Sequence, residues 1–511
     1  MKRLIWITFA ICWAIFSQGV SAWAQPAEVS LRIIGMNDFH GALVETDTYA
    51  GAAKLASVVT SLRDEAEGAV LVLAAGDMMQ GTMESNIERG QTVIRVMNHI
   101  GVDAMTVGNH EFDWGLDVLF ARAGEMDFPC LGANVIDRDS DKVLPCLQPY
   151  TLIRKDGITI GVIGVVTQDT ITSVNPKNIA TLRIEEPIRV ASDTIRVVRE
   201  AGADIVVLLA HMACYQEENG TLTGEAVRLA ELDGVDVIVS GHSHTQIVGT
   251  IGDTIIVQAG DKGRYLDVVD LIYSTEQKKI ISRQARLDAI DGKQVLADAE
   301  VVDMVKEATR HTEKMKQTEV GRLPVILLHD RRAVSPLGSW VADGIRSVAG
   351  TDIALQNGGG IRVSSLGTRV TEGNLYEMLP FDNTIYTAEL TGREVKAVLE
   401  QGLFDETHSI LQYAGLTVVC DAARPYGSRI VAIHLADGRT LQEDAVYTVA
   451  YNDFMAEGGD GYPHLGAANN LCNTGISLRE AVREYLQTAG GQRLPEERFY
   501  LLSMEEKKDV A

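Results

Sequence analysis

Short apolar segments, each ending in polar or glycine-rich sequence, dominate the first 290 residues of this chain. Longer segments with helical patterns, such as 52–65 and 190–200, lie between them. This alternation predicts an α/β layered fold in which functional sites lie at the carboxyl ends of the strands. The predicted strands are 31–36, 69–75, 103–107, 158–165, 204–210 and 235–239.

The pattern changes near residue 296. Residues 296–318 contain no proline or glycine and are rich in Ala, Glu, Lys, Val and Met, which predicts one long helix. A second α/β region with its own glycine-rich turn and aromatic residues follows. Because 511 residues are too many for one ordinary domain, we predict two. These are a catalytic domain at 25–295 and a second domain at 321–503, with a linker helix at 296–320 and a charged tail at 504–511.

The first 24 residues have the pattern of a signal peptide. Lys2 and Arg3 precede an apolar run at 4–16, and small residues at 22 and 24 suit a signal peptidase. The apolar run is shorter than the roughly 20 residues that a membrane span needs, so a retained anchor is the weaker alternative. We expect a mature protein without a membrane anchor, located in the periplasm or secreted.

The charge of the chain restricts its partners. The formal net charge is −24, which argues against binding to nucleic-acid polymers or to anionic membranes. An anionic substrate then needs positive charge that is concentrated locally, from metal ions or from a few arginines. The sequence leaves the oligomeric state open.

Five cysteines remain after removal of the predicted signal peptide. An odd number leaves at least one thiol free. Cys130 with Cys146 and Cys420 with Cys472 are candidate disulfides in an oxidising compartment, although connectivity cannot be read from a sequence. The chain has no Cys-x-x-Cys motif, so a thiolate metal site is not expected.

Side chains that bind metals follow the predicted strands of the first domain. Two first-row divalent ions a few Å apart need about seven nitrogen and oxygen ligands, with one carboxylate shared between them. Each residue alone has a simpler interpretation, such as a helix cap, a turn or a core histidine. Their conjunction in one domain favours a two-metal site made of Asp38, His40, Asp77, Asn109, His211, His242 and His244.

The segment Gly-Asn-His-Glu-Phe-Asp-Trp-Gly at 108–115 contains two further candidates for catalysis. We expect His110 to hydrogen-bond the phosphoryl oxygen and the leaving group in the transition state. Asp113 can accept a hydrogen bond from the other ring nitrogen, which fixes the tautomer and raises basicity. The alternative for Asp113 is a helix cap. We expect Glu111 to orient ligands rather than to coordinate a metal.

The order of the motifs NDFHG, AGD, GNHEFDWG, AH and GHSHT resembles the calcineurin-like metallophosphoesterases, and more narrowly the exported 5′-nucleotidase and UDP-sugar hydrolase family. The resemblance covers essentially the whole mature chain. It implies a four-layer α/β-β/α catalytic domain joined by a long helix to a C-terminal α/β 5′-nucleotidase domain. It also implies two divalent ions, Zn²⁺ or Mn²⁺, with the first held by Asp38, His40, Asp77 and His244 and the second by Asp77, Asn109, His211 and His242.

Two positions vary within the resembled family. Some relatives carry Gln where His244 stands. Relatives that act on 2′,3′-cyclic nucleotides tend to carry Asn where Asp113 stands, so the aspartate favours the 5′-nucleotidase branch.

The resemblance also implies a nucleoside pocket in the second domain. Phe381 and Tyr462 would sandwich the base, while Asn357 and Arg362 would contact base, ribose or phosphate. Core packing is the alternative for Phe381. Asp460 is a candidate for binding ribose hydroxyls. Arg332 is the candidate for a further substrate-binding arginine, but Arg331 and Arg332 are offset from the family position, and which of them contacts substrate stays open.

The sequence therefore predicts an exported 5′-nucleotidase that converts nucleoside 5′-monophosphates to nucleosides and phosphate. In-line attack by a metal-bound hydroxide is the expected mechanism, and UDP-sugars are possible additional substrates. A 2′,3′-cyclic nucleotide phosphodiesterase or nucleotide pyrophosphatase is the alternative. A catalytically inactive nucleotide-binding protein is a third hypothesis, which predicts lost ligands. The base preference and the physiological metal stay open.

Overall fold

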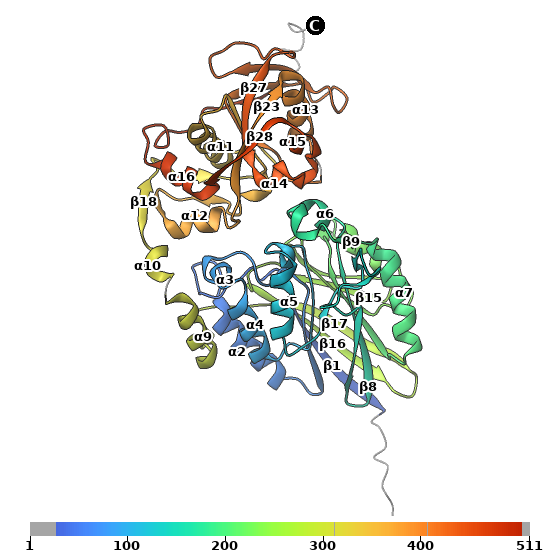
Figure 1. The fold of residues 1–511 in the computed structure, drawn as a ribbon. Coiled ribbons are helices and arrows are strands. Elements are labelled where there is room, and N and C mark those ends of the chain that lie inside the picture. The colour runs from blue at the N-terminus through green and yellow to red at the C-terminus, as the bar shows by residue number, and fades with distance from the viewer. Residues whose placement is uncertain (1–26, 311, 406, 503–511) are drawn as a thin grey trace, which may run out of the picture.

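The computed structural model describes residues 27–310, 312–405 and 407–502, which form two domains joined by a short helical connection (Figure 1). The predicted signal peptide and the predicted C-terminal tail both lie outside these ranges. No helix within them is both long and apolar enough to cross a membrane. All five cysteines that the structure describes are free, so neither candidate disulfide is formed.

The N-terminal domain contains two six-stranded sheets. The first has the order β17 (Lys279–Ala289), β16 (Tyr265–Ser274), β1 (Glu28–Met36), β2 (Ala69–Ala74), β3 (Ala104–Thr106) and β4 (Cys130–Leu131). The second has the order β14 (Gln246–Ile251), β15 (Thr254–Ala259), β13 (Val237–Ser240), β10 (Ile205–His211), β8 (Ile158–Val166) and β7 (Tyr150–Lys155). Each sheet has a parallel centre and antiparallel strands at one or both sides.

The two sheets pack face to face, and helices cover their outer faces. One apolar cluster, with Ile33, Leu71 and Val207, fills the space between the sheets. The outer face of the first sheet packs against α2 (Gly51–Asp64), α4 (Gln91–Ile100) and α9 (Ala299–Thr309). The outer face of the second sheet packs against α7 (Pro187–Glu200) and α8 (Glu225–Leu229). This arrangement confirms the four-layer α/β-β/α architecture.

Every strand that the apolar segments predict is present. The clearest example is β10, whose seven residues are all buried because parallel strands on both sides and apolar layers on both faces enclose it. A strand buried on both faces reads as a continuous apolar run. Shorter elements complete the domain: α3 (Met83–Ile87), α5 (Leu116–Glu125), α6 (Thr170–Ser173), β5 (Val135–Asp137), β6 (Lys142–Val143), β9 (Leu182–Ile184), β11 (Tyr215–Gln216), β12 (Leu222–Thr223) and the 3₁₀ turns η1 (His110–Phe112) and η2 (Pro176–Ile179).

The C-terminal domain is built on a five-stranded sheet with helices on both faces. Its order is β24 (Gln412–Ala414), β20 (Ile353–Gln356), β27 (Val446–Asn452), β23 (Thr384–Thr391) and β28 (Asn469–Ser477). One face packs against α11 (Pro336–Ala349), α12 (Glu372–Met378) and α16 (Leu478–Leu486), and the other against α13 (Gly392–Leu403). The smaller elements are β18 (Glu319–Arg322), β19 (Leu327–Leu328), β21 (Ser365–Leu366), β22 (Arg369–Thr371), β25 (Leu416–Cys420), β26 (Ile430–Leu435), β29 (Phe499–Leu501), α14 (Asp453–Ala456), α15 (Pro463–Gly466) and the turns η3 (Gly358–Gly360) and η4 (Gly459–Gly461).

The prediction of one long helix between the domains is wrong. The segment forms two helices, α9 and α10 (Glu313–Lys316), which are separated by a turn. The buried side chains of α9, Val301 and Ala308, pack against the N-terminal domain. In contrast, α10 packs on α12 of the C-terminal domain. Because the two halves are held by different domains, tertiary packing overrides the helical propensity of the sequence. The domain boundaries themselves stay a prediction.

One buried carboxylate of the N-terminal sandwich has no partner. Asp267 on β16 is fully buried, and neither of its oxygens makes a hydrogen bond within the described residues. Its side chain lies against Gly35 and the inward-facing Val239. Burial raises the pKa of Asp267 well above its usual range, because the ionised form has lost its hydration. The carboxyl is therefore expected to destabilise the fold at neutral pH.

We expect Asp267→Val to raise the free energy of unfolding by about 1–3 kcal/mol at pH 8. The pKa of Asp267 is higher in the folded protein than in the unfolded chain. The wild-type carboxyl therefore lowers the free energy of unfolding only when the pH rises above its pKa in the unfolded chain. The difference between variant and wild type should therefore shrink at pH 4.5. Urea unfolding of both metal-free proteins at the two pH values measures it, and a difference that does not change with pH would contradict this interpretation.

Candidate active site

The predicted metal ligands all lie where strands of the N-terminal domain end. Parallel strands of both sheets present their carboxyl ends at one edge, so side chains distant in sequence meet there. Within each of two groups, the ligand atoms lie within 4.8 Å of one another. The first group is Asp38, His40 and His244, and the second is Asp77, His211 and His242.

Hydrogen bonds to the backbone set the orientation of two histidines. Nδ1 of His40 lies 2.8 Å from the carbonyl oxygen of Gln80, and Nδ1 of His211 lies 2.8 Å from that of Ala75. A carbonyl can only accept, so each Nδ1 carries the proton and each Nε2 presents a lone pair. Metal-binding histidines in proteins are oriented in this way.

The lone pairs point at other electron-rich atoms. Nε2 of His40 lies 3.0 Å from Nε2 of His244, and Nε2 of His211 lies 3.1 Å from Oδ2 of Asp77. Oδ1 of Asn109 lies 3.2 Å from Nε2 of His211 and 3.0 Å from Nδ1 of His242. Oδ1 of Asp38 is buried, accepts no hydrogen bond from the described residues and lies 3.2 Å from Nε2 of His244. Converging donors of this kind fit two cations.

The ligands also sit on strained backbone. Twelve described residues other than glycine have positive φ, and five of them are predicted ligands, listed here with their angles: Asp38 (48°), His40 (51°), Asp77 (54°), His242 (74°) and His244 (57°). Side chains with a Cβ rarely adopt this region, and such strain is concentrated at functional sites. The surrounding fold therefore holds these side chains at an energetic cost.

Glu111 holds two of the ligand loops together. Its carboxylate accepts hydrogen bonds from the backbone N–H groups of Asp77 (2.7 Å), Met78 (2.9 Å) and Gly108 (2.7 Å). Burial, together with the charge of Asp77, raises the pKa of Glu111 to about 7. Both oxygens are occupied by backbone donors, so this residue orients the loops that carry Asp77 and Asn109.

Replacing Glu111 by Gln tests that role. The amide group cannot accept on its nitrogen, so at least one of the three N–H groups loses its partner. We expect the affinity for Zn²⁺ to fall about 10- to 100-fold, the usual cost of removing a partner that orients metal ligands. Competition with a chromophoric chelator measures the affinity without an assay of turnover. An unchanged affinity would show that the ligand loops hold their geometry without Glu111.

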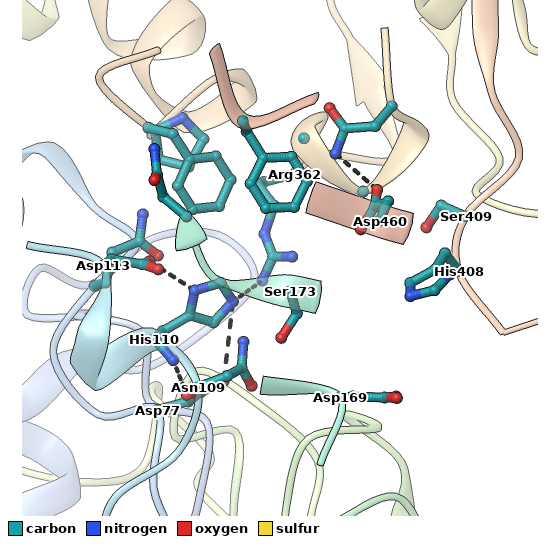
Figure 2. Close-up of a pocket in the computed structure, with 18 of the residues that line it drawn as sticks. Asp77, Asn109, His110, Asp113, Asp169, Ser173, Arg362, His408, Ser409 and Asp460 are labelled. Carbon is teal, nitrogen blue, oxygen red and sulfur yellow. Dashed lines mark hydrogen bonds and ion pairs between the residues drawn. The ribbon is translucent and has the colours of Figure 1, made fainter. Parts of the chain in front are cut away.

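His110 and Asp113 form a hydrogen-bonded pair at the edge of the metal groups. Nδ1 of His110 lies 2.7 Å from Oδ2 of Asp113, and Nε2 faces the guanidinium of Arg362 at 3.4 Å (Figure 2). The ring also stacks on Phe381, with 5.8 Å between centroids. The helix that follows, α5, is capped by Gly115 without a side-chain hydrogen bond. Asp113 is therefore a partner of His110 and not a helix cap.

A cavity of about 520 Å³ lies between the domains, next to the metal groups. Its wall includes Asp77, Asn109 and His110 from the N-terminal domain and Arg362 and Asp460 from the C-terminal domain (Figure 2). The candidate metal ligands of the N-terminal domain and residues of the C-terminal domain thus line the same pocket.

Two arginines in this pocket lack a counter-charge. Arg331 and Arg362 both line it, and neither makes an ion pair with a residue that the structure describes. The like charge of Arg362, together with burial, lowers the pKa of Arg331. Burial also lowers the pKa of Arg362. An anion bound between the two guanidinium groups would relieve their mutual repulsion.

Most of the predicted substrate residues line the pocket. They are Asn357, Arg362, Phe381, Asp460 and Arg332. Arg332 lies at the rim, where a guanidinium nitrogen is 3.4 Å from the carbonyl oxygen of His408. Nδ2 of Asn357 donates to Oδ2 of Asp460 at 3.0 Å, which orients that carboxylate.

The placement of Tyr462 in the pocket is wrong. Its side chain is 2% exposed and belongs to the apolar core of the C-terminal domain, with its hydroxyl packed against Gly402. The chain reverses in η4, where Asp460 has φ of 49°, so the carboxylate faces the pocket and the tyrosine turns inward. Phe454 lines the pocket instead.

Several other pocket residues are not among those that the sequence predicts. Phe454 had a usable signal, because it lies two residues after the end of β27 and aromatic side chains at strand ends are positioned as the metal ligands are. The others lie on loops or at the ends of short elements, whose direction no local pattern reveals. These residues are Trp114, Asp169, Ser173, Tyr215, His408 and Ser409.

Comparison with known proteins agrees with this geometry. The family model for calcineurin-like phosphoesterases matches residues 31–246, and that for the 5′-nucleotidase C-terminal domain matches residues 314–467. The chain belongs to the 5′-nucleotidase family of calcineurin-like metallophosphoesterases. It is a metal-dependent phosphoric ester hydrolase.

Members of this family resemble the chain over nearly its full length. Protein UshA of Yersinia enterocolitica is 28% identical, and the alignment covers 94% of each chain. The 5′-nucleotidase of Vibrio parahaemolyticus is 27% identical over 92% of this chain and 91% of that protein. The endonuclease YhcR of Bacillus subtilis is 29% identical over 91% of this chain, which spans only 40% of that longer protein.

A solved structure from the family has the same fold. The 5′-nucleotidase precursor of Thermus thermophilus superimposes with a TM-score of 0.82 at 28% identity, covering 93% of this chain and 99% of that chain. The two-domain architecture is therefore that of a 5′-nucleotidase.

Proposed function

We propose that this protein is an exported two-metal 5′-nucleotidase that hydrolyses nucleoside 5′-monophosphates to nucleosides and phosphate, with UDP-sugars as further substrates. The observation that carries the proposal is the pair of unpaired arginines, Arg331 and Arg362, beside His110 and the two ligand groups. Together they concentrate positive charge at one end of a pocket whose other walls carry aromatic rings. A phosphate attached to a nucleoside matches that distribution.

Two divalent ions, Zn²⁺ or Mn²⁺, would be held by the seven residues of the strand ends. Asp38, His40 and His244 would hold one ion and Asn109, His211 and His242 the other, and Asp77 would belong to both ligand sets. When bound, the ions would activate a water for attack on phosphorus and neutralise charge on the phosphoryl oxygens. The donor set of imidazole, carboxylate and amide oxygen suits first-row divalent ions.

The residues of the chain itself would position the substrate and move the proton. Arg331 and Arg362 bind the phosphoryl oxygens. His110 presents Nε2 to the ester oxygen that leaves as the nucleoside hydroxyl, and donates a proton to it. Asp113 stabilises the protonated ring by accepting from Nδ1 at 2.7 Å. No covalent bond to the enzyme is required.

The nucleoside would bind against the C-terminal domain. Phe381 and Phe454 both line the pocket, and the base would bind between their rings. Stacking tolerates several bases, because every base has a π-face. Asp460, held by Asn357, is placed to accept hydrogen bonds from ribose hydroxyls.

Phosphate release tests the proposal when the nucleotide products are also separated by chromatography, because opening a cyclic phosphodiester gives a monoester without free phosphate. AMP, UDP-glucose and 2′,3′-cyclic AMP are incubated with the enzyme and Mn²⁺ or Zn²⁺, with and without a chelator. We expect release from AMP that the chelator abolishes, slower turnover of UDP-glucose, and little from the cyclic nucleotide. Faster hydrolysis of the cyclic nucleotide would replace the proposal by the phosphodiesterase alternative. No chelator-sensitive release from any of the three would contradict the proposed activity.

A further inference from the structure

A second hollow lies in the C-terminal domain, directly behind the proposed nucleoside pocket. Its volume is about 910 Å³, and its walls come from α13, η4 and loop residues that include Phe404, Asp405 and Arg429. Thr407, His408 and Asp460 line both cavities. Figure 2 shows His408 and Asp460 on the side of the substrate pocket away from Asp113. The cavities therefore adjoin where the ribose hydroxyls are placed.

Positive side chains line this hollow although the chain has a net charge of −24. Lys396 on α13 is half-buried and makes no hydrogen bond or ion pair with any described residue. The guanidinium of Arg429 lies over the ring of Phe404 at 4.9 Å and over that of Tyr426 at 5.9 Å, and it makes no ion pair within the described chain. Two cations thus line the hollow without an ion pair to any described residue.

The acidic residues of the hollow do not neutralise these cations. Asp405 is bonded to Nδ1 of His408 at 2.9 Å. Glu400 is buried, and its Oε1 accepts from the N–H of Ile430 at 2.6 Å, while Oε2 has no partner in the described structure. Burial raises the pKa of Asp460 to about 6, and the nearby His408 opposes this rise. The hollow thus combines free cations, exposed aromatic faces and one unused acceptor, which together suit a nucleotide.

We propose that this hollow is a subsite for a second phosphate carried on the ribose 3′ oxygen of the substrate, alone or linking a further nucleoside. The proposal rests on the proposed function, because that function places the ribose at Asp460. A phosphate on the 3′ oxygen would then lie beyond Asp460 and contact Lys396. The base of a nucleoside attached to that phosphate would stack on Tyr426. The substrates are nucleoside 3′,5′-bisphosphates and short 5′-phosphorylated oligonucleotides.

The reaction at the metal site is unchanged by this subsite. Water adds to the 5′ phosphorus and the bond from phosphorus to the 5′ oxygen breaks, giving inorganic phosphate and a 5′ hydroxyl. The 3′ phosphate stays on the product. The hollow therefore affects substrate selection and not the chemical step.

Steady-state kinetics with AMP and with adenosine 3′,5′-bisphosphate test the subsite. At low ionic strength we expect the KM of the bisphosphate to be about fivefold to tenfold below that of AMP. Lys396→Ala should raise the KM of the bisphosphate to that of AMP, and Lys396→Arg should restore it. The KM of AMP should move less than about twofold, because the site of AMP lies elsewhere. Lys279→Ala, which removes one exposed positive charge from the other domain, is the matched control and should change neither value.

Two results would overturn the subsite. One is equal KM values for AMP and the bisphosphate in the wild type. The other is a parallel rise of both KM values in Lys396→Ala. If AMP is not hydrolysed at all, the proposed function fails. Calorimetric titration with the bisphosphate then decides the subsite separately: binding weakened by Lys396→Ala supports it, and binding unaffected by the change refutes it.

Discussion

Replacing His110 by Ala is expected to lower kcat for AMP about 10²- to 10⁴-fold, the contribution that general acid catalysis makes in enzymes. The reason is geometric. Nε2 of His110 faces the pocket beside Arg362, and Asp113 holds the other ring nitrogen at 2.7 Å. Without the ring, the nucleoside must leave as an unprotonated alkoxide. Stopped-time assays of phosphate release measure the loss.

The same variant separates catalysis from metal binding. His110 is not among the grouped ligands, so the metal content of His110→Ala should equal that of the wild type by elemental analysis. His434→Ala, which removes a histidine outside the pocket, should keep full turnover. Loss of metal from His110→Ala would show that His110 acts as a ligand and that its assignment to the leaving group is wrong.

Removing either of the two arginines without an ion pair, Arg331 or Arg362, is also expected to lower the activity on AMP strongly. Arg362→Ala and Arg331→Ala should each lower kcat/KM for AMP about 30- to 1000-fold, because losing a hydrogen-bonded contact between a guanidinium and the phosphate costs about 2–4 kcal/mol. Arg362 should affect kcat as well as KM, since it also faces His110 at 3.4 Å. Initial-rate measurements over a range of AMP concentrations separate the two parameters.

Arg332→Ala provides the comparison for these variants. Arg332 lies at the rim, close to the carbonyl oxygen of His408, whereas Arg331 faces Arg362. We therefore expect a smaller loss from Arg332→Ala than from Arg331→Ala. The opposite order would mean that Arg332 is the arginine that binds the phosphate.

The sequence predicted that the candidate metal ligands would lie together, because a simple rule positions them. Each ligand follows an apolar strand, and the carboxyl ends of parallel strands meet at one edge of a sheet. Asp77 after β2 and His211 at the end of β10 approach to 3.1 Å for this reason, although they lie 134 positions apart in the printed sequence. The buried runs that define the strands are also the strongest signal in the chain.

The second domain was harder to predict because its pocket is made by turns. Asp460 and Tyr462 are two residues apart, yet the left-handed conformation at Asp460 sends one to the pocket and the other into the core. Arg331 and Arg332 are neighbours on a loop, so only the loop conformation decides which one faces the substrate. The break between α9 and α10 depends likewise on which domain holds each half. None of these three outcomes is set by local composition or periodicity.

The most direct test of the two-metal 5′-nucleotidase is a crystal structure of the Zn²⁺-loaded protein with a non-hydrolysable AMP analogue, measured at the zinc absorption edge. We expect two anomalous peaks about 3.5–4 Å apart, one at Asp38, His40 and His244 and the other at Asp77, His211 and His242. We also expect the phosphate to lie between Arg331 and Arg362 and the base to lie between Phe381 and Phe454. A single peak, or a nucleotide bound away from this pocket, would contradict the proposal.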